Sequence, residues 1–338
     1  MGAEPAPVRI GLTRESSTAP LLVAIAAGYF RPEGLNPQVA FFDNDASVSA
    51  AVASGKVDIG MAALSAAFYR YAAAHRLKII ASRSSDQTGL PMYAFLISQE
   101  ARAAGFSGVR GLANVRIGVA DADSGEYYGL YSIASRFKLD SGSIRTTVLK
   151  SPEGELSALS RREIEAVILP FATALHAARQ GRSLLRLSDF AQWQQGVVFA
   201  SAQKIETDRT LIEKFMRAYQ RGTAEYALNF LNYDDGGDFI PGAHYDQYLD
   251  FIARQVNVSS HTLERTKTYC DRRGNLDAAD IEKQVQFWQN RGRLDKSMMA
   301  ADLLDLSFIG EEHSASYQVS STSPRFLVPH ASGVQRSR

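Results

Sequence analysis

The sequence predicts an α/β protein built on parallel sheets that are flanked by helices. Short apolar segments with strand character alternate with helical segments up to about residue 200. The alternation occurs in two blocks, of which the second begins near Gly108, and the chain after them is mainly helical. A strand, a helix and a further strand in this order form a parallel pair, so each block predicts a mostly parallel sheet.

Residues that begin and end helices support the elements of the first block. Pro20 suits the first turn of a helix, where its missing N–H is not needed, and Gly28 ends that helix. Asp45 is placed to cap the next helix. The expected elements are strand 8–12, helix 20–27, strand 38–42, helix 46–53, strand 59–61, helix 65–74, strand 77–82 and strand 92–97.

The second block repeats the alternation and is followed by the helical part of the chain. Its expected elements are strand 116–119, helix 126–137, strand 144–149, helix 152–160, strand 166–169, helix 171–180, strand 184–187 and strand 197–200. The helices expected after it are 208–229, 245–255, 278–290 and 299–306. Periodicity alone is equally compatible with two independent α/β domains.

Composition excludes several classes of function. Of the 338 residues, 45% are hydrophobic and 22% are charged, which is ordinary for a globular protein large enough for two cores. The net charge of +1 provides no basic excess for nucleic acid or an anionic membrane. No apolar run reaches the roughly 18 residues that span a bilayer. The single cysteine, Cys270, excludes an intrachain disulfide and a multi-cysteine metal site.

The sequence gives little support for catalysis. Its six histidines include no pair at i, i+4, and none falls in a loop that follows an expected strand, so we predict no metal site and no cofactor. The nucleophile-elbow pattern Gly-x-Ser-x-Gly is absent. A Ser-His-acid triad is an alternative that a single sequence leaves open.

Ligands of open α/β sheets bind beyond the carboxyl ends of the strands, beside helix N-termini. In the first block the guanidinium of Arg83 can donate two parallel hydrogen bonds to a carboxylate or sulfonate. Helix capping or turn formation explains the other polar residues equally well, and a solvent-facing salt bridge explains Arg83. The candidate ligand-binding residues of this block are Ser16, Ser17, Asn44, Ser65, Arg83 and Ser84.

The second block contributes a helix N-terminus and several aromatic residues. Free N–H groups at Ser124 favour an anion or a carbonyl oxygen, whereas Glu126 beside them opposes a strongly anionic ligand. Aromatic side chains can stack on a ring, and core packing is the alternative. The mixture favours an aromatic or heterocyclic acid over nitrate or taurine. The candidate residues of this block are Ser124, Gly125, Tyr127, Tyr128 and Phe171.

Two motifs resemble those of a known family. Ala-Ala-Gly-Tyr-Phe-Arg-Pro-Glu-Gly-Leu at 26–35 closes a helix, turns and starts an extended segment. Gly-Lys-Val-Asp-Ile-Gly at 55–60 leads into a buried strand. Through these motifs, residues from about 8 to 309 resemble the periplasmic solute-binding proteins of ABC importers. The subgroup is the NMT1/THI5-like one, which contains nitrate, sulfonate, taurine and pyrimidine-precursor binders.

The resemblance implies a two-lobed periplasmic-binding-protein fold of type 2. Each lobe would be a mostly parallel sheet flanked by helices, and two crossing strands, about 95–98 and 197–201, would form the hinge. Lobe I would comprise residues 1–95 and 200–310, including the C-terminal helices. Lobe II would comprise residues 96–199. Residues 311–338, which are rich in Ser, His, Pro and Arg, would be a flexible tail or an added segment.

The resemblance also implies a function without catalysis. The protein would capture a sulfonate, or an aromatic or heterocyclic carboxylate, between its lobes by hinge closure and deliver it to a membrane permease. We expect a monomer with no nucleic-acid partner. Residues 1–7 lack the basic and apolar regions of a signal peptide and taken literally indicate the cytoplasm. The resemblance instead implies a periplasmic protein whose signal peptide has been removed.

The alternative is an enzyme on the same fold, such as a sulfinate desulfinase-like hydrolase or a pyrimidine-precursor synthase. The synthase relatives have a cysteine cluster, and the desulfinases have a nucleophilic cysteine in the first loop. This chain has Ser16-Ser17 in that loop and no cysteine cluster. Cys270 lies in a late helical segment and is expected to be an inert packing residue.

Overall fold

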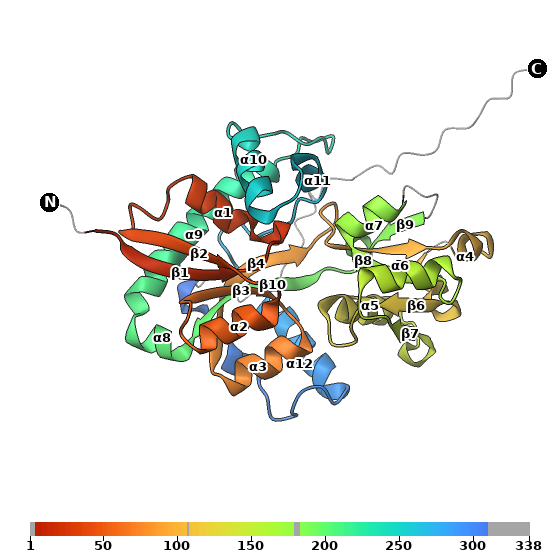
Figure 1. Cartoon of the computed structure of the whole chain (residues 1–338). Helices are drawn as coiled ribbons and strands as arrows, with labels where there is room; N and C mark the ends of the chain where they lie inside the picture. The colour runs from red at the N-terminus through yellow and green to blue at the C-terminus, as the bar shows by residue number, and fades with distance from the viewer. Residues whose placement is uncertain (1–3, 107, 179–182, 310–338) are drawn as a thin grey trace, which may run out of the picture.

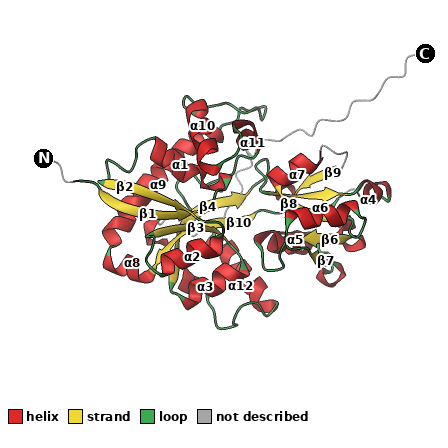
Figure 2. Ribbon diagram, viewed as in Figure 1, coloured by secondary structure: helices red, strands yellow, loops and turns green. Residues whose placement is uncertain are grey.

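The computed structural model describes residues 4–106, 108–178 and 183–309. Within these residues the chain forms two five-stranded sheets, each flanked by helices (Figures 1 and 2). The units built on the first and the second sheet are called lobe I and lobe II below. The predicted α/β fold with two sheets is confirmed.

The sheet of lobe I has the strand order β2-β1-β3-β10-β4. Strand β1 is parallel to β2 and β3, and β10 runs antiparallel to β3 and β4. Helices link the parallel strands, which is the arrangement expected of strand–helix–strand units. The elements are β1 (Ala6–Leu12), α1 (Ala19–Ala26), β2 (Leu35–Phe41), α2 (Asp45–Ala53), β3 (Ile59–Ala63), α3 (Ala66–Ala74), β4 (Leu77–Asp86) and β10 (Trp193–Ser201).

The sheet of lobe II has the strand order β7-β6-β8-β5-β9. Strand β6 is parallel to β7 and β8, whereas β5 is antiparallel to β8 and β9. The elements are β5 (Tyr93–Ile97), α4 (Gln99–Ala103), β6 (Arg116–Val119), α5 (Gly125–Arg136), β7 (Arg145–Val148), α6 (Pro152–Ser160), β8 (Ala166–Pro170), α7 (Phe171–Ala178) and β9 (Ser183–Arg186).

The chain crosses between the two sheets twice. It leaves lobe I after β4 and enters lobe II with β5, and it returns after β9 with β10. Each sheet therefore contains one strand that directly follows a crossing, β5 in lobe II and β10 in lobe I. Each of these strands runs antiparallel to both of its neighbours. The segments predicted as hinge strands, 95–98 and 197–201, overlap β5 and β10.

The C-terminal helices pack on lobe I. Helices α1, α9 and α10 cover one face of its sheet, and α2, α3 and α12 cover the other (Figure 1). The helices that follow β10 are α8 (Ala202–Thr207), α9 (Arg209–Phe230), α10 (Tyr245–Val256), α11 (Ser260–Arg265) and α12 (Ala278–Asn290). Among the described helices, none combines the length and apolarity that crossing a bilayer requires.

One buried junction connects the lobes through α12. Asp280 of α12 accepts hydrogen bonds from the Tyr128 hydroxyl of α5 (2.7 Å) and from the backbone N–H of Gln194 in β10 (2.8 Å). Nearby, Tyr127 of α5 stacks on Trp288 with their ring centroids 6.4 Å apart. An apolar cluster of buried residues is therefore continuous from lobe I into lobe II.

Three predictions of secondary structure need correction. Instead of a helix at 299–306, the structure has 3₁₀ turns at 300–303 and 306–308, because the intervening backbone is extended and the N–H of Asp305 bonds to the Ile79 carbonyl (2.9 Å). Strand β4 continues to Asp86 rather than ending at 82, because β10 pairs along it. The short helices α4, α8 and α11, each capped by a serine, were not predicted. The predicted tail at 311–338 lies outside the described residues.

Gly222→Ala should destabilise the protein. A Cβ atom at Gly222 of α9 would lie 2.3 Å from the Cβ of Ala24 and 2.8 Å from the carbonyl oxygen of Pro20, both in α1. Relieving this overlap should lower the free energy of unfolding by about 1–3 kcal/mol, although alanine is the better helix former. Urea unfolding measures the change. Gly108→Ala, where the added Cβ meets no atom within 4 Å, is the control. Equal stability of the two variants would contradict the close packing of α9 on α1.

Candidate functional site

A cleft of about 470 Å³ lies between the lobes, at the carboxyl ends of strands from both sheets. Its walls are the segments that follow β1, β2 and β3 in lobe I and those that follow β6 and β8 in lobe II. Tyr93 of β5 and Gln195 of β10 also line it, as does the segment around α11 from Val258 to Thr268. The cleft thus lies where the strand-end argument places a ligand.

Six of the predicted ligand-binding residues line this cleft, namely Ser16, Ser17, Ser65, Ser124, Gly125 and Phe171. Ser65 caps α3 by accepting a hydrogen bond from the N–H of Phe68 (3.0 Å), and its O–H proton remains available for a ligand. Ser124 caps α5 and also donates to the Asp121 carbonyl (2.7 Å), so its hydroxyl is already engaged. Ser17 donates to Glu15 (3.1 Å).

Three predicted residues are engaged elsewhere and do not line the cleft. Asn44 caps α2 by accepting from the N–H of Ser47 (2.9 Å). Tyr128 donates to Asp280, and Tyr127 packs against Trp288. The periodicity of α5 predicts a buried aromatic face, but it does not say that α12 rather than a ligand covers that face.

Arg83 and Ser84 lie beneath the cleft wall because β4 extends past them. The Arg83 side chain is fully buried, and its Nη2 lies 3.3 Å from Oε2 of Glu15. Its Nε and Nη1 have no hydrogen-bond partner among the described residues. The guanidinium also lies against the backbone of Gly196, where a Cβ atom would be 2.4 Å from Nε. Arg83 can therefore be packed here only because residue 196 has no side chain.

Carboxylates dominate the charged groups that line the cleft. Four acids face it, Glu15, Asp45, Asp121 and Glu126, together with one arginine, Arg14. Arg14 donates to the Gln255 carbonyl and lies over the Phe41 ring, with its Cζ atom 4.0 Å from the ring centroid. Sequence reasoning expected Asp45 to cap the second helix, where the cap is Asn44 instead, and it noted that Asp45 and Glu126 both disfavour an anion. The position of both at the start of a helix that follows a strand was the available signal.

Burial raises the pKa of two of these acids, Asp45 and Glu126, toward neutral pH. It raises the pKa of Asp45 to about 6, although the charge of Arg83 opposes the shift. It raises the pKa of Glu126 to about 7, against hydrogen bonds from Ser124 and from its own N–H. Behind Glu126, the buried Glu155 has a pKa of about 8, raised by desolvation and by the charge of Glu126. A carboxyl group that is costly to ionise keeps its proton to a higher pH.

Two uncharged residues that sequence reasoning missed come from the strands that follow the crossings. The Gln195 side chain donates from Nε2 to the Tyr93 hydroxyl (3.0 Å) and accepts from Ser84 (3.4 Å). Strands β5 and β10 show no polar loop signal in the sequence, which is why these positions were not selected. Among the described residues, neither Cys270 nor a histidine lines the cleft, and no group of acids, histidines and cysteines could hold a metal ion.

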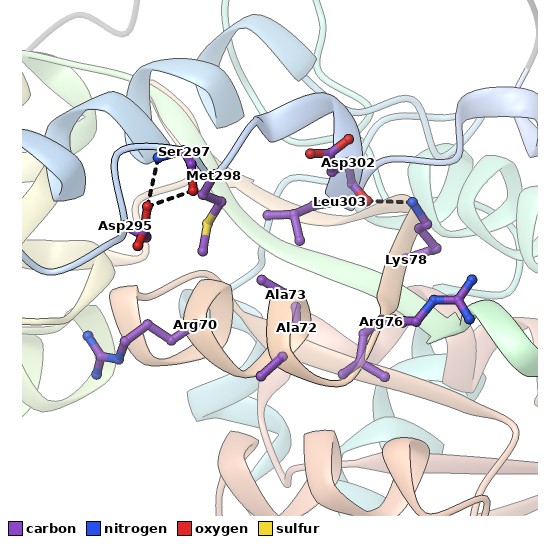
Figure 3. A pocket seen from close by; sticks show the side chains of 12 residues that line it. Arg70, Ala72, Ala73, Arg76, Lys78, Asp295, Ser297, Met298, Asp302 and Leu303 are labelled. Atoms are coloured by element: carbon purple, nitrogen blue, oxygen red, sulfur yellow. Dashed lines mark hydrogen bonds between the residues drawn. The ribbon is translucent and has the colours of Figure 1, made fainter.

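A second, larger hollow of about 780 Å³ lies on lobe I, between the end of α3, the start of β4 and residues 295–303 (Figure 3). Several of its polar groups are already paired. Lys78 donates to the Asp302 carbonyl, and Asp295 accepts from Ser297. It lies near the amino end of β4, away from the helix N-termini. The cleft between the lobes is therefore the stronger candidate for a ligand site.

Glu126→Gln should reduce the pH dependence of stability. Because the native pKa of about 7 exceeds the ordinary 4.5, the native state holds this proton more tightly, and ionisation removes stability as pH rises through that interval. Glutamine cannot ionise, so the variant should gain on the order of 1–3 kcal/mol over the wild type between about pH 5 and about pH 8.

Urea unfolding at the two pH values measures this gain. Glu282→Gln, which removes an exposed carboxyl group in α12, is the control and should leave the pH profile unchanged. Parallel profiles of the wild type and Glu126→Gln would contradict the burial of an ionisable Glu126.

Comparisons with known proteins agree with this architecture. The alkanesulfonate-binding protein SsuA from Xanthomonas axonopodis pv. citri, bound to MOPS, superposes with a TM-score of 0.61 at 15% identity, over 90% of this chain and 100% of that one. The aliphatic sulphonate binding protein SsuA from Escherichia coli superposes with a TM-score of 0.63 at 15% identity, over 88% of this chain and 99% of that one. The nitrate-binding protein NrtA from Synechocystis PCC 6803 superposes with a TM-score of 0.62 at 10% identity, over 90% of this chain and 87% of that one.

At these identities the likeness shows the fold, and these neighbours are named as binding proteins and not as enzymes. No curated protein matches the sequence. The sequence model of the family described as NMT1/THI5 like matches residues 15–229, which is more than half of the chain. The chain therefore belongs to the NMT1/THI5-like family and has the periplasmic-binding-protein fold.

Proposed function

We propose that this protein is the solute receptor of an ABC importer. The observation that carries the proposal is a single cleft lined from both lobes, beside the first turns of α2, α3, α5 and α7. A small organic solute in this cleft would contact both lobes at once. Structural neighbours named as sulfonate- and nitrate-binding proteins of the periplasm support the proposal.

The mechanism would be hinge closure. Two crossings join the lobes, and a ligand that contacts both walls would bind the closed form more tightly and shift the population toward it. The hinge would separate lobe I, residues 1–95 and 200–310, from lobe II, residues 96–199. Beside the cleft, the backbone carbonyl of Asp123 in lobe II already accepts a hydrogen bond from the N–H of Ala66 in lobe I (2.9 Å). The Asp123 carboxylate forms an ion pair with Arg70 of lobe I (3.1 Å). These polar contacts would form part of the closed interface.

The proposed ligand contacts include residues from both lobes. Hydroxyl groups at Ser16, Ser17 and Ser65 would hold polar atoms, and Phe171 with Tyr93 would hold a ring. A sulfonate, or an aromatic or heterocyclic carboxylate, would have Arg14 and the buried Arg83 as its available cations. The closed protein, a periplasmic monomer, would then deliver the solute to a membrane permease and require no cofactor.

Gly125→Leu should abolish solute binding. A Cβ atom at Gly125 would lie 3.1 Å from the Leu64 carbonyl oxygen of the opposite lobe, so a leucine side chain would occupy the cleft. A bound solute at a hundred times its Kd stabilises the wild type by about 2.7 kcal/mol, and the variant should show no such gain.

Thermal unfolding with and without a panel of sulfonates, carboxylates, amines and small-molecule extract measures the effect. Ser135→Leu, at an exposed position of the same helix, is the matched control and should keep the shift. An unchanged shift in Gly125→Leu would place the solute outside the cleft.

A further inference from the structure

The charge of the cleft restricts what it can bind. Its lining includes four carboxylates and one arginine, and that arginine is held by the Gln255 carbonyl and the Phe41 ring. The buried Arg83 adds one positive charge behind the lobe I wall, but Glu15 lies 3.3 Å from it and offsets that charge. A solute that carried only negative charge would meet repulsion from both walls.

The lobe I wall contains a carboxylate oxygen, Oδ1 of Asp45, that accepts no hydrogen bond from the described residues. Asp45 accepts the N–H of Ala63 through Oδ2 (3.0 Å), whereas its buried Oδ1 has no hydrogen-bond partner among the described residues. A buried carboxylate oxygen without a donor costs free energy because it has lost its water. A ligand N–H group directed at this oxygen would recover that cost.

The lobe II wall has a pair of buried carboxyl groups. The Glu126 side chain is 8% exposed and lines the cleft, and Glu155 behind it is fully buried, with no hydrogen-bond partner for either of its oxygens among the described residues. The charge of ionised Glu126 raises the cost of ionising Glu155. A ligand cation at Glu126 would favour the ionised form of this carboxyl group, which a neutral or anionic ligand would not do.

We propose that the solute carries a protonated nitrogen, which lies between Asp45 of lobe I and Glu126 of lobe II when the lobes close. The inference rests on the proposed receptor function and specifies the class of its ligand. An organic ammonium or amidinium group fits better than a metal ion, because no group of metal-ligating side chains is found among the described residues. A charged hydrogen bond to a carboxylate from each lobe would couple binding to closure.

The test separates a bacterial small-molecule extract by charge. Ion exchange at neutral pH divides it into cationic, neutral and anionic fractions, and the melting temperature of the protein is measured with each. We expect the melting temperature to rise with the cationic fraction or with zwitterions of the neutral fraction, such as amino sulfonates and amino carboxylates, and not with the anionic fraction, since only a ligand of the native state stabilises it. Mass spectrometry of the solute retained after desalting then identifies the nitrogen group.

Two isosteric variants locate the interaction. Asp45→Asn and Glu126→Gln should each raise the Kd of the retained solute by about tenfold to a hundredfold, the loss expected for a charged hydrogen bond. Asp43→Asn and Glu282→Gln, at exposed positions that do not line the cleft, are the matched controls and should leave the Kd unchanged. Equal affinity in all four variants would overturn the proposed placement of the nitrogen.

The outcomes distinguish the two proposals. A shift with the anionic fraction alone, or with a neutral solute that mass spectrometry shows to lack a basic nitrogen, would overturn the protonated-nitrogen inference and leave the receptor function intact. No shift with any fraction would overturn the receptor function together with it.

Discussion

The position of the cleft depends on the hydrogen bonds around Asp280. This buried carboxylate joins α12, the returning strand β10 and helix α5, which belongs to the other lobe. Gln284 also donates to it (2.9 Å), so both of its oxygens are occupied. Because the N-terminus of α5 forms one wall of the cleft, the junction fixes where Ser124, Gly125 and Glu126 stand relative to lobe I. A buried hydrogen-bonded network holds the three elements together more firmly than apolar contact alone, so the proposed closure would turn lobe II about this junction.

Much of the architecture could be predicted because local signals agreed with the global fold. Strand periodicity, Pro20 and the strand-end rule together indicated both sheets and the loops that line the cleft. The prediction failed where a distant partner decides the outcome. Tyr127 and Tyr128 face α12 rather than the cleft, and Arg83 became part of a strand because β10 pairs beside it. Tyr93 and Gln195 could not be predicted because antiparallel insertion after a crossing has no local sequence signal.

The ligand chemistry is a separate question from the fold. Neighbours named for sulfonates and nitrate share 10–15% identity with this chain, a level at which the fold is kept while the site varies. In this chain the first turns of α2 and α5 place carboxyl groups in the cleft, where free backbone N–H groups alone would favour an anion. The side chains thereby reverse the preference that the helix dipoles create.

The contact between Arg83 and Gly196 links two positions that are far apart in the sequence. The guanidinium occupies the space that any side chain at 196 would need. During divergence these two positions can therefore change only together: a larger residue at 196 requires a shorter one at 83, which would remove the buried cation behind the lobe I wall. Relatives with a side chain at the position of Gly196 should consequently have a more negative cleft, or should have lost an acid such as Glu15 in compensation. Glycine at this position thus permits a buried cation behind the lobe I wall of the cleft.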